Sequence, residues 1–349
     1  MASNTASLIL QDSEIILSRV DFSELDGKTI LITGASGLVG HYFVAALRLA
    51  YKNGINITKI YLVTKSEPTN CFADLTKEMP VELLSGDLAD VNFLSELPMS
   101  DYIIHAAGYG QPGKFMDNQV KTLALNTIST LMLFERLNQG GKYLFLSTSE
   151  VYNGLTAPPF REDQIGTTNT DNFRSCYIEG KRSGEAIVYA YRNKGVHASS
   201  ARLSLAYGPG TRPDDVRVIN EFIKKALFDN RIELKDMGTS MRTYLYVTDA
   251  VEILFNILFK SKEGVYNVGG HSRTSILDLA KSIGKSIGIP VITPDQQGVG
   301  LSGAPDDVYM DMSKAENEFG KTGYISFQEG LDKTIQWQKN MYLENKLNS

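Results

Sequence analysis

The chain has 349 residues, enough for one large domain or two unequal lobes whose core needs no disulfide bonds. Hydrophobic residues make up 42% and charged residues 21%, which excludes the composition of a disordered protein. The net charge is -5 and the Lys and Arg residues are scattered, which argues against a nucleic-acid partner.

Residues 1–27 are expected to form an N-terminal helical arm. Apolar side chains between residues 8 and 20 recur at a spacing that suits a short amphipathic helix, which we interpret as an arm packed on the main domain. Asp12 and Glu14 interrupt the apolar run, which also lacks a basic flank and membrane-spanning length. We therefore expect no membrane partner and a cytoplasmic location.

Residues 28–207 alternate short apolar runs with helical patterns. This alternation predicts an α/β fold of the Rossmann type, a doubly wound parallel sheet with helices on both faces. The predicted strands are 28–33, 60–64, 81–84, 102–105 and 143–147, and the helix after the first strand is 41–52.

Residues 208–349 are expected to form a smaller substrate-binding lobe that interleaves with the first, with a cleft between the two. Gly208, Pro209, Gly210 and Pro213 open a charged loop where the character of the sequence changes. The predicted elements of this lobe are helices 218–228, 249–259 and 275–287 and strands 231–234 and 243–247.

Neither a disulfide nor a metal site is expected. Cys71 and Cys176 lack CxxC spacing, and the four histidines are scattered without a recognisable ligand pattern.

Three glycines follow the first predicted strand. Gly34, Gly37 and Gly40 form GxxGxxG between that strand and a helix. The first permits a tight turn, the second lets the backbone approach a pyrophosphate, and the third lets helix and strand pack closely. This context predicts a dinucleotide site.

The type of dinucleotide stays open at this point. The second strand ends at Thr64 without the acidic residue that usually binds the ribose 2′-hydroxyl. Lys65 could neutralise a 2′-phosphate or be an exposed cation, so NADP is not excluded. Asp87 and Leu88 are placed to bind the adenine, although an Asp-capped helix explains them equally well.

Tyr177 and Lys181 are four residues apart and therefore lie one turn apart on one face of a helix. A nearby ammonium favours the phenolate and can make a tyrosine a useful base near neutral pH. The pair follows the predicted strand end at Ser147 and Thr148 by about 30 residues, and this position favours a catalytic reading.

Together these motifs resemble the extended short-chain dehydrogenase/reductase family, over nearly the whole chain. The features that carry the resemblance are residues 34–40, Asp87-Leu88, His105-Ala106-Ala107-Gly108, Thr148, and Tyr177 with Lys181. Within that family, residues 121–128, 147–152 and 176–182 and Arg242 most resemble UDP-glucuronate decarboxylases. The cofactor-binding residues that the resemblance implies are Gly34, Ser36, Gly37, Leu38, Val39, Gly40, Thr64, Asp87, Leu88, Ala106, Ala107, Thr122, Tyr177 and Lys181.

The resemblance also implies a mechanism on a nucleotide-sugar. Tyr177 would remove the proton of the sugar 4-hydroxyl as hydride leaves C4, Thr148 would bind the same oxygen, and Lys181 would hold the nicotinamide ribose. Glu150, helped by Ser149, would manage protons at C5 of the 4-keto sugar. Arg242 would pair with a C6 carboxylate that is then lost as carbon dioxide. Because the hydride is returned, retained NAD is preferred to NADP.

Three alternatives remain. A 4,6-dehydratase of this family carries Asp and Glu after the threonine, whereas Ser149 stands here in place of the Asp. A 4-epimerase would not need Glu150, which could simply be a carboxylate at a strand end. A non-catalytic dinucleotide-sensing regulator would be expected to lose Tyr177 and Lys181.

Other positions concern the substrate and a partner subunit. Leu205 and Phe115 stand where the resemblance leads us to expect an asparagine and a tyrosine in the substrate site. Arg217 would either bind a diphosphate or be a solvated helix residue.

The resemblance also implies a homodimer built from the helix that bears Tyr177 and a helix over 118–138. Its apolar residues fit a dimer interface or the protomer core equally well, namely Leu125, Leu131, Leu133 and Phe134.

Overall fold

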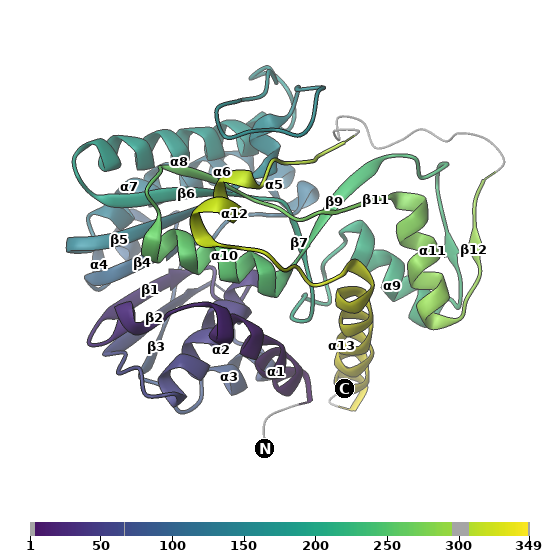
Figure 1. The fold of residues 1–349 in the computed structure, drawn as a ribbon, viewed down its shortest axis with the longest axis horizontal. Coiled ribbons are helices and arrows are strands. Elements are labelled where there is room, and N and C mark those ends of the chain that lie inside the picture. The colour runs from purple at the N-terminus through teal and green to yellow at the C-terminus, as the bar shows by residue number, and fades with distance from the viewer. Residues whose placement is uncertain (1–3, 66, 295–306, 348–349) are drawn as a thin grey trace.

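The computed structural model describes residues 4–65, 67–294 and 307–347 (Figure 1). Seven strands form a parallel sheet in the order β10-β6-β5-β4-β1-β2-β3, which confirms the predicted doubly wound α/β fold. The strands are β1 Thr29–Thr33, β2 Lys59–Thr64, β3 Val81–Ser85, β4 Ser100–His105, β5 Leu137–Thr148, β6 His197–Leu203 and β10 Val265–Val268.

The two faces of the sheet bury separate apolar cores, because successive side chains of a strand point to opposite faces. Ile30 and Ile32 of β1 pack on one side, whereas Leu31 packs on the other. The first core includes helices α1 Asn4–Arg19, α2 Leu38–Lys52, α3 Asn70–Leu75 and α10 Val247–Lys260. The second includes α4 Val91–Glu96, α6 Gln119–Asn126, α7 Ile128–Phe134 and α8 Ser175–Asn193.

Two smaller sheets, one of three strands in the order β11-β9-β7 and one of two strands, β12-β8, lie with two helices beside the main sheet, at the right of Figure 1. The helix predicted at 218–228 has those bounds, and the two strands predicted nearby are shifted by one or two residues at their ends. The elements of this region are β7 Leu205–Tyr207, α9 Val218–Phe228, β8 Ile232–Glu233, β9 Met241–Tyr246, β11 Ser272–Ser275, α11 Ile276–Ile287 and β12 Val291–Ile292. The chain also forms α5 Pro112–Asp117, α12 Ser313–Phe319 and α13 Phe327–Leu347.

The chain passes between the two regions more than once. β7, which precedes residue 208, pairs with β9 in the smaller sheet, whereas α10 and β10 return to the main sheet. The division of the chain at residue 208 stays a prediction.

The helix predicted over 118–138 is wrong in extent. It is divided at Thr127, which has φ −114 and ψ −70, and the second piece ends at Phe134. β5 already begins at Leu137, because this segment pairs with the start of β4. Leu125, Leu133 and Phe134 are buried in the protomer core, whereas Leu131 is exposed.

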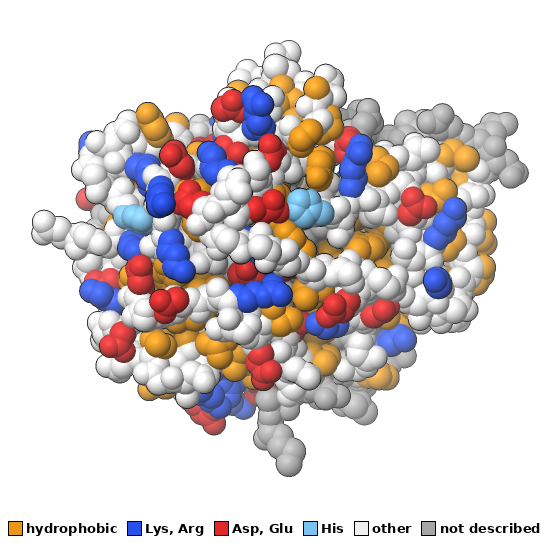
Figure 2. Space-filling view, in the orientation of Figure 1, with side chains coloured by type: hydrophobic (Ala, Val, Ile, Leu, Met, Phe, Trp, Pro, Cys, Tyr) orange, Lys and Arg blue, Asp and Glu red, His pale blue; other side chains and the backbone are white. Residues whose placement is uncertain are grey.

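On the face seen in Figure 2, basic and acidic side chains are interspersed. Within the described ranges, no helix combines the length and the apolar character that crossing a bilayer requires.

The N-terminal arm is anchored by one buried carboxylate. Asp12 of α1 accepts hydrogen bonds from Tyr42 Oη on α2 at 2.9 Å and Tyr246 Oη on β9 at 2.5 Å. Lys333 Nζ on α13 donates to the same carboxylate at 3.0 Å. Asp12 therefore joins the arm to both the main sheet's helices and the strand that carries Arg242.

We predict that Asp12→Ala lowers the free energy of unfolding by about 2–3 kcal/mol, because two buried hydroxyls and an ammonium lose a charged acceptor. Glu14→Ala, an exposed carboxylate on the same helix, is the control and should change stability by less than about 0.5 kcal/mol. Urea denaturation of both variants measures the difference. Equal effects would contradict the anchoring role.

Candidate active site

The three glycines lie in the turn after β1 and the first turn of α2, and the space around a Cβ differs among them. Gly34 has φ +71, and a Cβ there would lie 2.8 Å from the backbone of Ala106. A Cβ on Gly40 would lie 2.3 Å from the carbonyl oxygen of Ala35. Gly34 and Gly40 are therefore required by the turn itself. A Cβ on Gly37 would meet only the carbonyl oxygen of Gly34, at 3.3 Å.

Gly37 is also the N-cap of α2, and no side chain caps the helix there. The first N–H groups of a helix have no partner within it, so the amides of Leu38 and Val39 suit an anion. An uncapped helix end beside a glycine with free space fits a dinucleotide pyrophosphate. Ser36 lies in this turn, and its cofactor-binding role stays a prediction.

The backbone opposite the turn is held by two buried polar side chains. Thr33 Oγ1 lies 2.8 Å from His105 Nδ1 and accepts a hydrogen bond from the amide of Ala107 at 3.2 Å. Burial, together with the charge of Lys181, lowers the pKa of His105 to about 3, so its imidazole is neutral. These contacts place Ala106 and Ala107 against Gly34.

The predicted adenine end of the site combines a turn and a charge cluster. Asp87 Oδ1 accepts a hydrogen bond from the amide of Ala89 at 3.0 Å, and the other carboxylate oxygen pairs with Lys121 and with Lys65, at 3.4 Å for Lys65. Thr64 is buried at the end of β2. The cofactor-binding roles of Asp87, Leu88, Thr64 and Thr122 stay predictions.

Tyr177 and Lys181, the predicted proton-transfer pair, lie beside the end of β5. Thr148 ends this strand, and Ser149–Tyr152 form a short 3₁₀ helix in which the Glu150 amide donates to Thr148 Oγ1 at 3.3 Å. Burial raises the pKa of Tyr177 to about 12, against the hydrogen bond from Thr148 and the charges of Arg174 and Arg217, which lower it. The structure thus brings Thr148, Glu150 and Tyr177 together.

Lys181 points toward the same strand. Its Nζ donates to the carbonyl oxygen of Leu146 at 2.6 Å and lies 6.0 Å from the centroid of the Tyr177 ring. Burial lowers the pKa of Lys181 to about 7, while the charge of Glu185 acts in the opposite direction. A cation near a buried phenol favours the phenolate form.

Glu185 was missed by the sequence analysis. It lies four residues after Lys181, on the same face of α8, and its carboxylate accepts from Arg202 Nη2 at 2.8 Å and Ser147 Oγ at 2.5 Å. The sequence contains a signal for Glu185, because the four-residue spacing between Tyr177 and Lys181 repeats once more along the helix.

The sequence analysis also missed Arg174 as a partner of Glu150 and Phe115 as a packing partner of Tyr177. Arg174 pairs with Glu150 through two nitrogens, at 2.5 and 3.2 Å. Phe115 is 1% exposed, and its ring stacks on Tyr177 with centroids 4.6 Å apart and planes 6° apart. Phe115 therefore supports the Tyr177 ring from behind. No sequence signal links Arg174 to Glu150, which lies 24 residues away.

The two predicted substrate arginines lie in the smaller region. Arg217 precedes α9 and binds Asp215 through Nη2 at 2.6 Å and Nε at 3.0 Å. Arg242 of β9 donates to the carbonyl oxygen of Met241 at 2.6 Å. Burial raises the pKa of Tyr244, whereas the charges of Arg242 and Arg217 both lower it, so both arginines lie near enough for their charges to act on that residue. Their substrate roles stay predictions.

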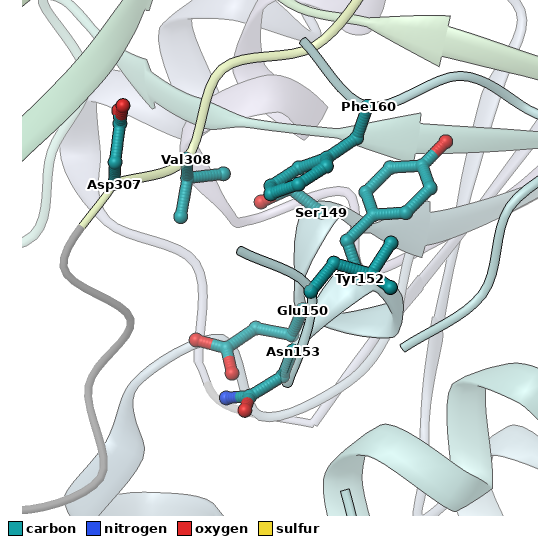
Figure 3. Close-up of a pocket in the computed structure, with 8 residues that line it drawn as sticks. Ser149, Glu150, Tyr152, Asn153, Phe160, Asp307 and Val308 are labelled. Atoms are coloured by element: carbon teal, nitrogen blue, oxygen red, sulfur yellow. The ribbon is translucent and has the colours of Figure 1, made fainter. Parts of the chain in front are cut away.

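A cavity of about 20 Å³, large enough for about one water molecule, opens beside the predicted C5 residues (Figure 3). Asp307, on the far side from Glu150, is paired with Arg273. The lining residues are Ser149, Glu150, Tyr152, Asn153, Leu155, Phe160, Asp307 and Val308. In the ranges described, no three metal-ligating side chains gather at one place.

The model of the NAD dependent epimerase/dehydratase family matches residues 30–269. The chain belongs to this family. UDP-glucuronic acid decarboxylase 6 of Arabidopsis thaliana is 31% identical over 307 residues, which cover 86% of each chain. UDP-glucuronic acid decarboxylase 1 of Xenopus tropicalis is 32% identical over 332 residues, 94% of this chain and 76% of the relative. Membership in the NAD-dependent epimerase/dehydratase family confirms the predicted enzyme class and the NAD cofactor.

Solved structures agree on the fold. UDP-glucose 4-epimerase of Thermotoga maritima superposes with a TM-score of 0.76 at 21% identity, over 90% of this chain and 99% of the other. dTDP-glucose 4,6-dehydratase of Streptomyces venezuelae gives the same TM-score and identity over 91% and 98%. These likenesses confirm the epimerase/dehydratase architecture.

We predict that Gly37→Val weakens NAD binding by about 10²-fold or more, because its side chain occupies the space that the pyrophosphate needs. The variant should still fold, since the backbone of Gly37 is extended at φ −83, with a loss of only about 1 kcal/mol from the helix cap. Calorimetric titration of cofactor-free protein measures the affinity, and thermal unfolding provides the control. Unchanged affinity would show that the pyrophosphate lies elsewhere.

We predict that Lys181→Met and Tyr177→Phe each lose about 10²-fold or more in turnover, because each removes a proton-transfer group. Between pH 7 and about 10, only Lys181→Met should alter the pH dependence of stability. The folded pKa of Lys181, about 7, lies below its ordinary value of 10.5, so wild-type stability rises with pH between these values. Lys181→Met removes this slope and should be more stable than wild type at pH 7 without cofactor, by up to about 4 kcal/mol. Urea denaturation across this pH range measures it, and equal slopes would contradict the buried, titrating ammonium.

Proposed function

We propose that this chain decarboxylates a nucleotide-linked uronic acid through a 4-keto intermediate. The observation that carries the proposal is the sequence Thr148-Ser149-Glu150 beside Tyr177, with a serine where a dehydratase needs an acid. The relatives in Arabidopsis and Xenopus bear the name UDP-glucuronic acid decarboxylase, which supports a uronic acid as the substrate.

Bound NAD would accept the hydride from C4 of the sugar and later return it. Tyr177 takes the proton of the 4-hydroxyl, and Thr148 donates a hydrogen bond to the same oxygen. With burial holding the pKa of Tyr177 at about 12, the phenol needs a cation to ionise near neutral pH, and Lys181 is placed to supply it.

The 4-ketone makes the C6 carboxylate part of a β-keto acid. When the bond between C5 and C6 breaks, carbon dioxide leaves and its bonding electrons form an enolate on the C4 oxygen, where Thr148 and Tyr177 stabilise it. C5 then takes a proton from a water molecule, for which the cavity beside Ser149 and Glu150 has room. Arg242 supplies positive charge to the carboxylate before its loss, and Arg217 to the diphosphate.

The test is to incubate the purified protein with nucleotide-linked uronic acids and with the matching neutral hexoses. We expect carbon dioxide and a nucleotide-pentose from a uronic acid, without net NADH, detected by mass spectrometry and NMR. Glu150→Gln should slow the steps after oxidation, so that 4-keto sugar or reduced cofactor accumulates. Arg242→Ala should raise KM and lower kcat together.

Other products would contradict the proposed decarboxylation and identify a different activity. A 4-keto-6-deoxy hexose from a neutral substrate identifies a dehydratase, and a C4-inverted sugar with all six carbons identifies an epimerase. Cofactor binding without turnover of any sugar identifies a regulator.

We also propose that the chain forms a homodimer through α6, α7 and α8. Apolar side chains are exposed on these helices, with Val120 at 82% and Leu131 at 45%. Leu123, Ile128 and Tyr189 extend the same set. The cytoplasmic location stays a prediction.

We predict that Val120→Asp with Leu131→Asp yields a folded monomer, because two charges would be buried in the interface. Ile292→Asp, on an exposed strand of the smaller region, is the control and should leave the dimer intact. Light scattering after size-exclusion chromatography gives the mass. A dimeric double variant would place the interface elsewhere.

A further inference from the structure

Glu150 lines the cavity and forms an ion pair with Arg174. The Nη2 and Nε atoms of Arg174 approach its two carboxylate oxygens at 2.5 and 3.2 Å, which is the bidentate geometry of strong arginine–carboxylate pairs. The Arg174 side chain is 8% exposed and that of Glu150 21%. Partial burial makes this pair less screened than a surface ion pair.

Arg174 is itself held from several directions. Its guanidinium carbon lies 5.4 Å from the centroid of the Phe115 ring, and the same ring stacks on Tyr177. Its backbone amide donates to Asn172 Oδ1 at 2.9 Å, just before α8 begins. One guanidinium therefore fixes Glu150 directly and touches the support of the Tyr177 ring.

The charges around the cavity are balanced before any substrate enters. Two carboxylates line it, those of Glu150 and Asp307, and each has its own arginine, Arg174 and Arg273. A sugar with its 4-hydroxyl at Tyr177 and Thr148 would bring a C6 substituent toward Glu150. A second carboxylate a few ångströms from an unpaired Glu150 would weaken binding on the order of 10²-fold.

We propose that Arg174 is a positioning and specificity residue, which neutralises Glu150 and thereby lets the site accept a sugar that carries a carboxylate. This inference rests on the proposed function. Arg242 remains the direct partner of the sugar carboxylate. Arg174 acts from behind Glu150 and does not touch the sugar.

The test compares UDP-glucuronate with UDP-glucose, which differ only at C6, by calorimetry on NAD-loaded protein. Tyr177→Phe serves as the background, because it should slow turnover by about 10²-fold or more and keeps a ring to stack on Phe115. In this background Arg174→Met should weaken UDP-glucuronate binding by about 10²-fold and UDP-glucose binding by less than about 3-fold. Adding Glu150→Gln should restore most of the lost affinity, because the repelling charge is gone. Arg231→Met, which removes a guanidinium paired with Glu233 on the surface, should change neither affinity.

Two results would overturn the inference. Failure of Glu150→Gln to restore binding would mean that Arg174 contacts the sugar itself. Equal losses for both sugars would mean that Arg174 only maintains the fold.

A second measurement separates this inference from the proposed function. Exchange of the Arg174 Nε–H proton with solvent, followed by NMR without any sugar, should be at least about 10-fold slower than that of exposed Arg231. Glu150→Ala should remove the protection. Protection without any binding of UDP-glucuronate would overturn the proposed function and the sugar specificity with it. UDP-glucuronate turnover without protection would overturn the role of Arg174 alone.

Discussion

The buried ion pair between Glu185 and Arg202 holds α8, the helix that bears Tyr177 and Lys181, against the sheet. Arg202 of β6 donates to both carboxylate oxygens of Glu185, at 2.8 to 3.2 Å, and Ser147 of β5 donates to the same carboxylate at 2.5 Å. A buried pair of this kind is costly to break, because either partner alone would leave an uncompensated charge. Close packing adds to the constraint, since a Cβ on Gly184 would lie 2.4 Å from the Phe145 ring. The height and rotation of α8 on β5 are therefore fixed.

The placement of the proton-transfer groups follows from this contact. Glu185, Lys181 and Tyr177 occupy successive turns on one face of α8, so fixing the first fixes the other two. Lys181 is then held at a buried site where its ammonium donates a hydrogen bond to the Leu146 carbonyl and burial disfavours its charged form. Such a cost is expected at a functional position, where a lysine that titrates near neutral pH would be useful as a proton-transfer partner.

Local patterns in the sequence predicted much of the fold. Apolar runs and the glycine turn predicted the parallel sheet, and α9 has the predicted bounds, because these features depend on neighbouring residues. Tyr177 and Lys181 could be found since their spacing is itself local. The division of the helix at Thr127, the early start of β5 and the pairing of β7 with β9 depend on contacts distant in sequence. The ion pair of Glu150 with Arg174 also joins residues that are distant in sequence.

Phe115 and Leu205 illustrate how such distant contacts change the meaning of a substitution. Phe115 has no hydroxyl to offer a sugar, but its ring lies against the Arg174 guanidinium and the Tyr177 ring. It thereby links the arginine that pairs with Glu150 to the tyrosine that is predicted to remove the proton. Leu205 pairs with Tyr244 across the smaller sheet, and the charges of Arg217 and Arg242 both act on that tyrosine. The loss of an amide at Leu205 thus falls where two arginines already provide positive charge, so recognition of a diphosphate there would depend on charge more than on a directional amide hydrogen bond.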